Sequence, residues 1–419
     1  MGKGRTVLRK VERVINPKFE KYQWLKPEDL LEIQKRHLCS MIRAAYRHVP
    51  YWHREMKRRG IGPDDVKCAA DLRKLPITSK VGMRGKEEFI ADNIKWLGPE
   101  LWHTGGSTGQ MLSYYTTDLS RHAIDSCRIR GWKWAGCQPR DKIATFTGGG
   151  LSSKNLRLDC VGMDEKVMDK HIEMINKSRV DAYRGIPSAL MTFARHVERR
   201  GLDMKKKCVL TTSENLLPVH RKFIGDVLGE VYDGYGANDG GSSAFECEEH
   251  KGWHISADKS IFEVLDRNGN PVAPGEEGIL TVTCLFNYGM PWIRYMSNDL
   301  AVLSDEKCSC GRGLPLMSKL LGRTTDLIRT RNTVINGTEL ANNVIGHNLP
   351  IRAFQFIQTS AQRLEVRIAR ESDWSEEHRV VILNILQTYD PQIEVTFTFP
   401  EDIPKTPAGK SQYVISQLK

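Results

Sequence analysis

Residues 209–236 read VLTTSENLLPVHRKFIGDVLGEVYDGYG. Val209–Thr212 and Val231–Tyr235 are short runs of strand-forming residues, and the segment between them contains a helix predicted over His220–Leu228. A strand, a helix and another strand in this order indicate an α/β core with a largely parallel sheet.

The same alternation extends to earlier parts of the chain. A buried strand is predicted at Lys142–Phe146, and further helices are predicted at Leu119–Trp134, Val167–Asn176 and Pro187–Arg199. Residues Pro27–Arg59 also have helical spacing, which breaks at His48–Trp52 because the residue before a proline is pushed out of helical geometry.

The downstream part has a different character. After Gly252 the strands shorten and turn signals multiply, as at Asp266–Asn270, which indicates antiparallel pairing. The last hundred residues mix short strands with one helix, Glu376–Thr388. We therefore predict an α/β fold in two domains. Residues 1–322 form a large domain of parallel sheets and helices with an antiparallel β part at 247–310, and residues 323–419 form a small, mobile α+β lid.

Composition restricts the class of partner. The chain has 419 residues and a net charge of +11, which favours anionic partners such as nucleotides and coenzymes. No nucleic-acid-binding signature, membrane span or signal peptide is recognisable, so we expect neither nucleic-acid binding nor membrane insertion. Ten cysteines without a secretion signal predict reduced thiols and a cytoplasmic protein. A homodimer stays open.

A glycine-rich segment, Thr104–Gly109, combines three glycines with three hydroxyl residues. Glycine allows the backbone to approach a ligand closely, and hydroxyl and N–H groups suit phosphate oxygens. The following segment, Met111–Thr117, predicts a strand. The segment lacks the Gly-Lys-Ser/Thr of the Walker loop. Taken alone, it is also compatible with an ordinary surface loop.

Further short signatures follow this loop in a fixed order: Thr212–Glu214, Asp233–Asp239, Ile293–Asp299, Leu321–Ile328 and Asp402–Ser411. In order and approximate spacing they resemble the motifs of the adenylate-forming superfamily of acyl-CoA synthetases, adenylation domains and luciferases. Within it the chain resembles the phenylacetate–CoA ligase branch, and particularly its relatives from capsular-polysaccharide gene clusters. The segments His48–Tyr51, Leu75–Lys80 and Tyr183–Ser188 support that branch.

The resemblance implies an ATP site. The phosphates would be wrapped by the glycine-rich loop, that is by Thr104, Gly105, Gly106, Ser107, Thr108 and Gly109. The adenosine would be bound by Ser213, Glu214, Asp233, Gly234, Tyr235, Gly236, Asn238, Asp299 and Arg323. Among these, Tyr235 would stack on the base, Asp233 would accept a hydrogen bond from the adenine amino group, and Asp299 would accept them from the ribose hydroxyls.

The resemblance also implies the catalytic groups. Asp239 would help to hold Mg²⁺ near the phosphates, and Lys410 would bridge the carboxylate substrate and the α-phosphate. Two positions depart from the family pattern: Gln110 replaces the usual lysine of the phosphate loop, and Thr325 replaces the acidic hinge residue. Adenylation is therefore expected to be intact, whereas the thioester-forming step is less well supported.

A second group of residues has metal-ligand chemistry. Cys247 and His250 lie about sixty residues before Cys308 and Cys310, and together they offer three thiolates and one imidazole. Such a set predicts a structural zinc that ties together the ends of the antiparallel part, as similar sites do in this branch. His254 is a competing ligand. Four unrelated loop residues are the alternative.

We therefore predict ATP-dependent activation of a carboxylic acid to its acyl-adenylate, with release of pyrophosphate and acyl transfer to coenzyme A. One alternative acceptor is an amine, such as an amino-sugar or an amino acid. A different class is a nucleotide-binding scaffold without catalysis, against which the intact Lys410, Asp299 and Asp239 argue. Individually, these residues also fit ordinary roles: an Asp299–Arg323 ion pair, a core aromatic at Tyr235 and a surface lysine at Lys410.

Overall fold

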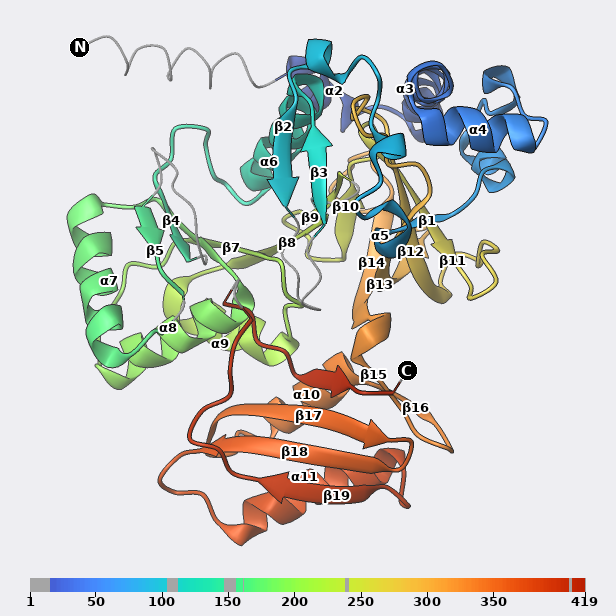
Figure 1. The fold of residues 1–419 in the computed structure, drawn as a ribbon. Helices are drawn as coiled ribbons and strands as arrows, with labels where there is room; N and C mark the ends of the chain where they lie inside the picture. Colours follow the sequence, from blue (N-terminus) through green and yellow to red (C-terminus); the bar gives the residue numbers. More distant parts are fainter. Residues whose placement is uncertain are drawn as a thin grey trace. The chain divides into compact units, whose positions relative to one another are not determined.

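The computed structural model describes residues 16–103, 112–146, 156–160, 162–237, 241–406 and 409–418. Figure 1 shows the helices and strands along the chain. The chain divides into two compact units, each built from two separate stretches of sequence. The first unit comprises residues 1–140 and 232–319, and the second comprises residues 141–231 and 320–419.

The first part of the second unit is a parallel sheet with helices. The strands run in the order β7-β6-β4-β5, and the elements are β4 (Ile143–Phe146), β5 (Leu156–Leu158), α7 (Glu165–Ser178), β6 (Ala182–Gly185), α8 (Pro187–Arg199), β7 (Cys208–Thr212) and α9 (Pro218–Leu228). The strands and helices predicted here are confirmed. The parallel pairing is in register from Ala144 through Tyr183 to Val209.

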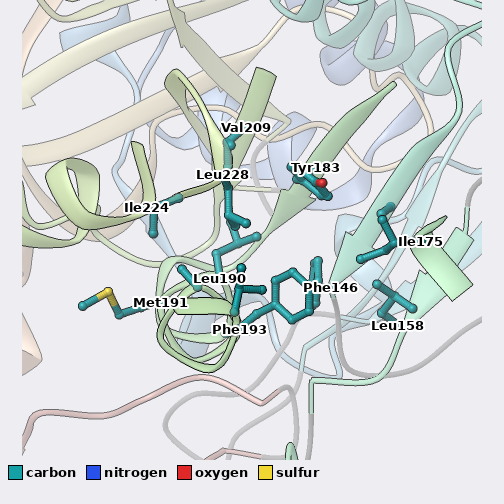
Figure 2. Packing of buried hydrophobic residues seen from close by; sticks show 14 of the residues in the cluster. Phe146, Leu158, Ile175, Tyr183, Leu190, Met191, Phe193, Val209, Ile224 and Leu228 are labelled. Atoms are coloured by element: carbon teal, nitrogen blue, oxygen red, sulfur yellow. The ribbon is translucent and has the colours of Figure 1, made fainter. Parts of the chain in front are cut away.

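The core of this sheet is aromatic and aliphatic (Figure 2). The rings of Phe146 from β4 and Phe193 from α8 lie 4.8 Å apart, and Leu190 and Ile224 are fully buried with them. Gly185 is required by this packing, since a Cβ there would lie 2.9 Å from the Cβ of Phe146. Burial of such side chains stabilises the sheet by about 1.5–3 kcal/mol each.

The rest of the second unit is a small α+β part. A four-stranded sheet has the order β19-β18-β17-β20, and its elements are β17 (Ile351–Ser360), β18 (Arg363–Arg370), β19 (Glu394–Thr398), β20 (Val414–Ser416), α10 (Gly337–Gly346) and α11 (Glu376–Tyr389). A separate hairpin pairs β15 (Leu327–Arg329) with β16 (Val334–Asn336). The predicted terminal α+β character is confirmed, and the domain boundary at residue 322 stays a prediction.

The N-terminal part of the first unit consists of α-helices, 3-10 helices (η) and short strands. They are α2 (Pro17–Tyr22), α3 (Pro27–His48), α4 (Pro50–Arg58), η1 (Pro63–Asp65), η2 (Ala69–Lys74), β1 (Thr78–Ser79), α5 (Lys80–Met83), η3 (Glu87–Phe89), η4 (Ile94–Leu97), β2 (Glu100–His103), β3 (Ser113–Thr116) and α6 (Asp118–Trp134). The predicted break at His48–Trp52 is the boundary between α3 and α4, where Val49 is extended before Pro50. No helix in the described ranges is both long and apolar enough to cross a membrane.

Antiparallel strands complete the first unit, and the last of them, β14, continues past Lys319 into the second unit. They are β8 (Val231–Ala237), β9 (Ser242–Glu246), β10 (Trp253–Ile255), β11 (Ser260–Leu265), β12 (Glu277–Cys284), β13 (Tyr295–Ser304) and β14 (Leu316–Arg323), which leads to η5 (Thr324–Asp326). Antiparallel pairing links β11 to β12, β12 to β13, β8 to β9, and β10 to both β9 and β14. It therefore begins at β8, before the predicted position at Gly252, because β8 and β9 are joined by a short connection.

Candidate active site

The strands before and after the glycine-rich segment pair with each other. Strands β2 and β3 pair antiparallel, with His103 opposite Ser113, and the His103 imidazole Nδ1 lies 2.9 Å from the Ser113 hydroxyl. The strand predicted after the loop is confirmed at Ser113–Thr116. The loop residues Thr104–Gly109 and Gln110 lie outside the described residues, so their role in phosphate binding stays a prediction.

Two of the predicted ATP-site residues meet in the first unit. The hydroxyl of Tyr235, on β8, donates a 2.7 Å hydrogen bond to Oδ2 of Asp299, on β13, although the two residues lie 64 positions apart. Both side chains are buried. Burial and the neighbouring carboxylate raise the pKa of Tyr235 well above its ordinary value, so the phenol stays protonated and acts as the donor.

A β-bulge places Asp299. Between the Ile279–Leu300 pair and the Thr281–Met296 pair, β12 advances by two residues while β13 advances by four. Asn298 adopts φ 65°, the Ser297 hydroxyl donates to Leu280 O at 2.9 Å, and the Asp299 N–H donates to the Ser297 hydroxyl at 3.1 Å. Bulges re-aim side chains next to functional sites, and this one turns a strand residue toward Tyr235.

Asp233 is held by its own strand neighbours. Its N–H donates to Oε2 of Glu246 at 2.8 Å, and its Oδ2 accepts a 3.1 Å hydrogen bond from the indole N–H of Trp253. The carboxylate therefore already accepts a hydrogen bond from Trp253, and its contact with adenine stays a prediction. Gly234 and Gly236 flank Tyr235 on β8, paired with Phe245 and Ser243.

Several other predicted residues of the ATP and Mg²⁺ sites belong to the second unit or lie outside the described residues, so their place in an ATP site stays a prediction. Asn238 and Asp239 lie outside the described residues. Arg323 ends β14 and belongs to the second unit, as do Ser213 and Glu214. Ser213 follows β7 directly, is exposed and has φ 72°, a left-handed conformation that marks a sharp turn of the backbone.

The carboxylate of Glu214 connects two segments of the second unit, at Ser188 and Ser411. Its Oε1 accepts hydrogen bonds from the Ser188 hydroxyl at 3.0 Å and from the Ser411 N–H at 2.8 Å, and its Oε2 accepts one from the Ser188 N–H at 3.1 Å. Burial raises the pKa of this carboxyl, while the hydrogen bonds and the charge of Lys410 act in the opposite direction. The sequence motifs contain Ser188 and Ser411 but gave no sign of this contact.

Lys410 precedes the residue that contacts Glu214 and is hydrogen-bonded to Thr406. Its N–H donates to the Thr406 hydroxyl at 3.1 Å, and its carbonyl oxygen accepts the Thr406 N–H at 3.0 Å. Gly409 has φ 77°, which only glycine adopts without strain. Pro407 and Ala408 of the predicted turn lie outside the described residues, and the N–H of Ser411, which follows Lys410, donates to Glu214.

The first unit contains a compact group of metal-ligand atoms from Cys247, His254, Cys308 and Cys310, all within 4.8 Å of one another. The sulfurs of Cys247 and Cys308 lie 3.7 Å apart, and Nε2 of His254 lies 3.3 Å from the Cys310 sulfur. A tetrahedral zinc with sulfur ligands at about 2.3 Å requires sulfur–sulfur distances near about 3.8 Å. The donor set fits zinc.

His250, predicted as the fourth ligand, lies outside this group and is replaced by His254. His250 has φ 51° in the turn after β9, and its Nδ1 lies 3.3 Å from Oε2 of Glu246. His254, on β10, is fully buried, and its Nδ1 lies 3.2 Å from Leu314 O. A donor bond from Nδ1 leaves Nε2 for a metal, as in many metal-binding histidines.

Comparison with known proteins connects these features. Residues 327–417, which include the Lys410 turn, match the family model described as the CapK C-terminal domain. The phenylacetate-coenzyme A ligase of Thermus thermophilus is 27% identical over 333 residues, 75% of this chain and 74% of the relative. The chain is a relative of the phenylacetate-coenzyme A ligases. The resemblance to the adenylate-forming superfamily that the motifs indicated is confirmed.

Two further matches span nearly the whole of the present chain. Protein CapK of Staphylococcus aureus is 19% identical over 422 residues, 93% of this chain and 90% of CapK. A crystal structure of 2-hydroxyisobutyryl-CoA ligase in complex with an acyl-AMP has a TM-score of 0.81 at 18% identity, covering 95% of this chain and 92% of that one. The ligase fold therefore includes both compact units.

Proposed function

We propose that this protein is an ATP- and Mg²⁺-dependent, AMP-forming carboxylate ligase. The observation that carries the proposal is the relationship to the phenylacetate-coenzyme A ligases over three quarters of the chain. The buried Tyr235–Asp299 pair supports it, because a carboxylate held by a neutral phenol keeps acceptor capacity for the two ribose hydroxyls.

In the proposed reaction, an oxygen of the substrate carboxylate forms a bond to the α-phosphorus of ATP. The bond from that phosphorus to the bridging oxygen breaks, and pyrophosphate leaves with the electron pair. Two anions must approach each other, so a cation at the reacting oxygens lowers the barrier. In this proposal Lys410 supplies that charge and the Thr104–Gly109 loop binds the departing phosphates, while Asp239 would hold Mg²⁺, which would offset phosphate charge.

The acyl group then passes to an acceptor, which we propose is coenzyme A. The thiol sulfur attacks the acyl carbon, the thiol proton is lost, and AMP leaves. The support comes from the relatives, which are named as coenzyme A ligases. An amine is the second candidate acceptor, which the sequence departures at Gln110 and Thr325 leave open.

The test is pyrophosphate release with a panel of aryl-acetic, benzoic and hydroxyalkanoic acids, each assayed alone, with coenzyme A and with amines. We expect at least one acid to release pyrophosphate and form a thioester. Amide formation without thioester would replace coenzyme A by an amine. Measurable ATP binding with no pyrophosphate from any acid would favour the non-catalytic scaffold.

We also propose a structural zinc held by Cys247, His254, Cys308 and Cys310. The support is the donor set and its spacing, and four protein ligands leave no open position for catalysis. Cys308→Ser should release about one zinc per chain in a colorimetric assay and lower the melting temperature, whereas His250→Gln should retain the metal. Native protein that contains no zinc would refute the site.

A further inference from the structure

The loop after β7 contacts the C-terminal part of the second unit at two points. Glu214 accepts the Ser411 N–H at 2.8 Å, and Nδ2 of Asn215 donates to the Thr338 hydroxyl at 3.2 Å, in the first turn of α10. Both bonds join segments more than a hundred residues apart within one compact unit. The first bond reaches the peptide that immediately follows Lys410.

Glu214 is itself anchored on a rigid element. Ser188 is the second residue of the thirteen-residue helix α8, and both its N–H and its hydroxyl donate to the Glu214 carboxylate. A carboxylate at a helix N-terminus satisfies an unpaired N–H and interacts favourably with the helix dipole. The position of Glu214 is thus set by α8, whose buried face packs in the core shown in Figure 2.

On the other side of the contact, hydrogen bonds restrain the described residues next to Ser411. Two hydrogen bonds join Thr406 to Lys410, and the Gly409 N–H donates to Thr406 O at 2.7 Å. With these residues bonded to one another, fixing the Ser411 N–H also fixes the origin of the Lys410 side chain. A continuous set of contacts therefore runs from α8 through Glu214 to Lys410.

We propose that Glu214 is a positioning residue for Lys410, one that holds the lysine turn in place for adenylate formation. This inference rests on the proposed function, since it assumes that Lys410 acts in that step. It differs from the adenine-slot role that the sequence motif implied for Glu214. The three hydrogen bonds that its carboxylate accepts direct both oxygens toward Ser188 and Ser411.

The two roles predict different kinetics. Glu214→Ala removes the acceptor for the Ser411 N–H, so kcat for acid-dependent pyrophosphate exchange should fall about 10- to 100-fold, the usual effect of a lost hydrogen bond to a charged group. The Kd for ATP, measured by calorimetry, should change less than about 3-fold, because in this proposal Glu214 does not contact the adenine base. A weakened ATP Kd with unchanged kcat would overturn the proposal in favour of the adenine slot.

A conservative variant separates positioning from folding. Glu214→Gln keeps a carbonyl oxygen that can accept the Ser411 N–H, so its kcat should recover to within about 3-fold of the wild type. Equal losses of kcat in the Gln and Ala variants, at equal melting temperature, would contradict the proposal. Glu173→Ala, at an exposed position on α7, is the matched control and should leave kcat and Kd unchanged.

A double-mutant cycle tests whether the effect passes through Lys410. In the Lys410→Ala background, Glu214→Ala should reduce residual exchange by less than about 2-fold, since there is no lysine left to position. The same loss in both backgrounds would overturn the inference. The proposed function fails separately, if wild-type protein releases no pyrophosphate with any acid. Wild-type activity that Glu214→Ala leaves intact would refute only the inference.

Discussion

The Tyr235–Asp299 pair and the Glu214–Ser411 contact are built by different means. The first joins two buried side chains on antiparallel strands, and a bulge in β13 aims one of them. The second joins a side chain to a backbone N–H on a turn, where no strand pairing enforces it. Strand-held groups suit binding, which needs a fixed shape, whereas a single backbone hydrogen bond suits a segment that, in the proposed function, engages and releases during the reaction.

The largest expected effect lies on the turn. Lys410→Ala should reduce adenylate formation at least about 1,000-fold, because the charge that offsets the approach of two anions is lost. ATP binding should stay nearly unchanged. Pyrophosphate exchange and calorimetric ATP binding measure the two quantities, with the exposed Lys177→Ala on α7 as control. Near-normal pyrophosphate exchange would contradict the proposal that Lys410 acts in catalysis while Tyr235 and Asp299 act in ATP binding.

The strand pair should show the opposite pattern. Asp299→Ala removes the proposed ribose acceptor and leaves the Tyr235 hydroxyl without its partner, so the ATP Kd should rise about 10- to 100-fold. The kcat at saturating ATP should fall much less. Titration of ATP in the exchange assay gives both values, and the exposed Asp305→Asn is the control. A loss confined to kcat would show that Asp299 acts in chemistry rather than in binding.

Acidity should affect the second unit through His220. This buried side chain of α9 has its pKa lowered to about 4, first by burial and then by Arg195. Between its unfolded value of about 6.5 and pH 4, the unfolded chain binds a proton that the folded chain does not, so stability is lost as pH falls. From pH 7 to pH 5 the loss is about 2 kcal/mol.

Urea unfolding at pH 7 and pH 5 measures this effect. In His220→Gln the pH-dependent loss of unfolding free energy should be smaller than in the wild type by that amount. His347→Gln, at an exposed position after α10, should keep the wild-type dependence. An unchanged dependence in the His220 variant would assign the acid sensitivity to other groups.

The two regions also differ in how far the sequence predicts them. Periodicity and Pro50 were sufficient for the parallel sheet and the α3–α4 boundary, because both follow from local preferences. The order of the motifs predicted Tyr235 and Asp299 as residues of an ATP site, although only strand pairing brings the two side chains together. The partners of Glu214 lie 26 and 197 residues away, and no local pattern encodes such contacts. His254 replaced His250 for a similar reason, since backbone turning decides which ring reaches the thiols.

The smallest expected effect separates two roles of one residue in the strand pair. Tyr235→Phe keeps the ring proposed to stack on adenine and removes only the hydroxyl that donates to Asp299. Loss of one such bond should weaken ATP binding about 3- to 10-fold and leave kcat nearly unchanged. Tyr235→Ala should weaken binding further, since stacking is lost as well. Tyr389→Phe on α11 is the matched control. If the Phe and Ala variants bind ATP equally, the hydroxyl's hold on Asp299 is the whole contribution of Tyr235, and the ring makes no stacking contact with the base.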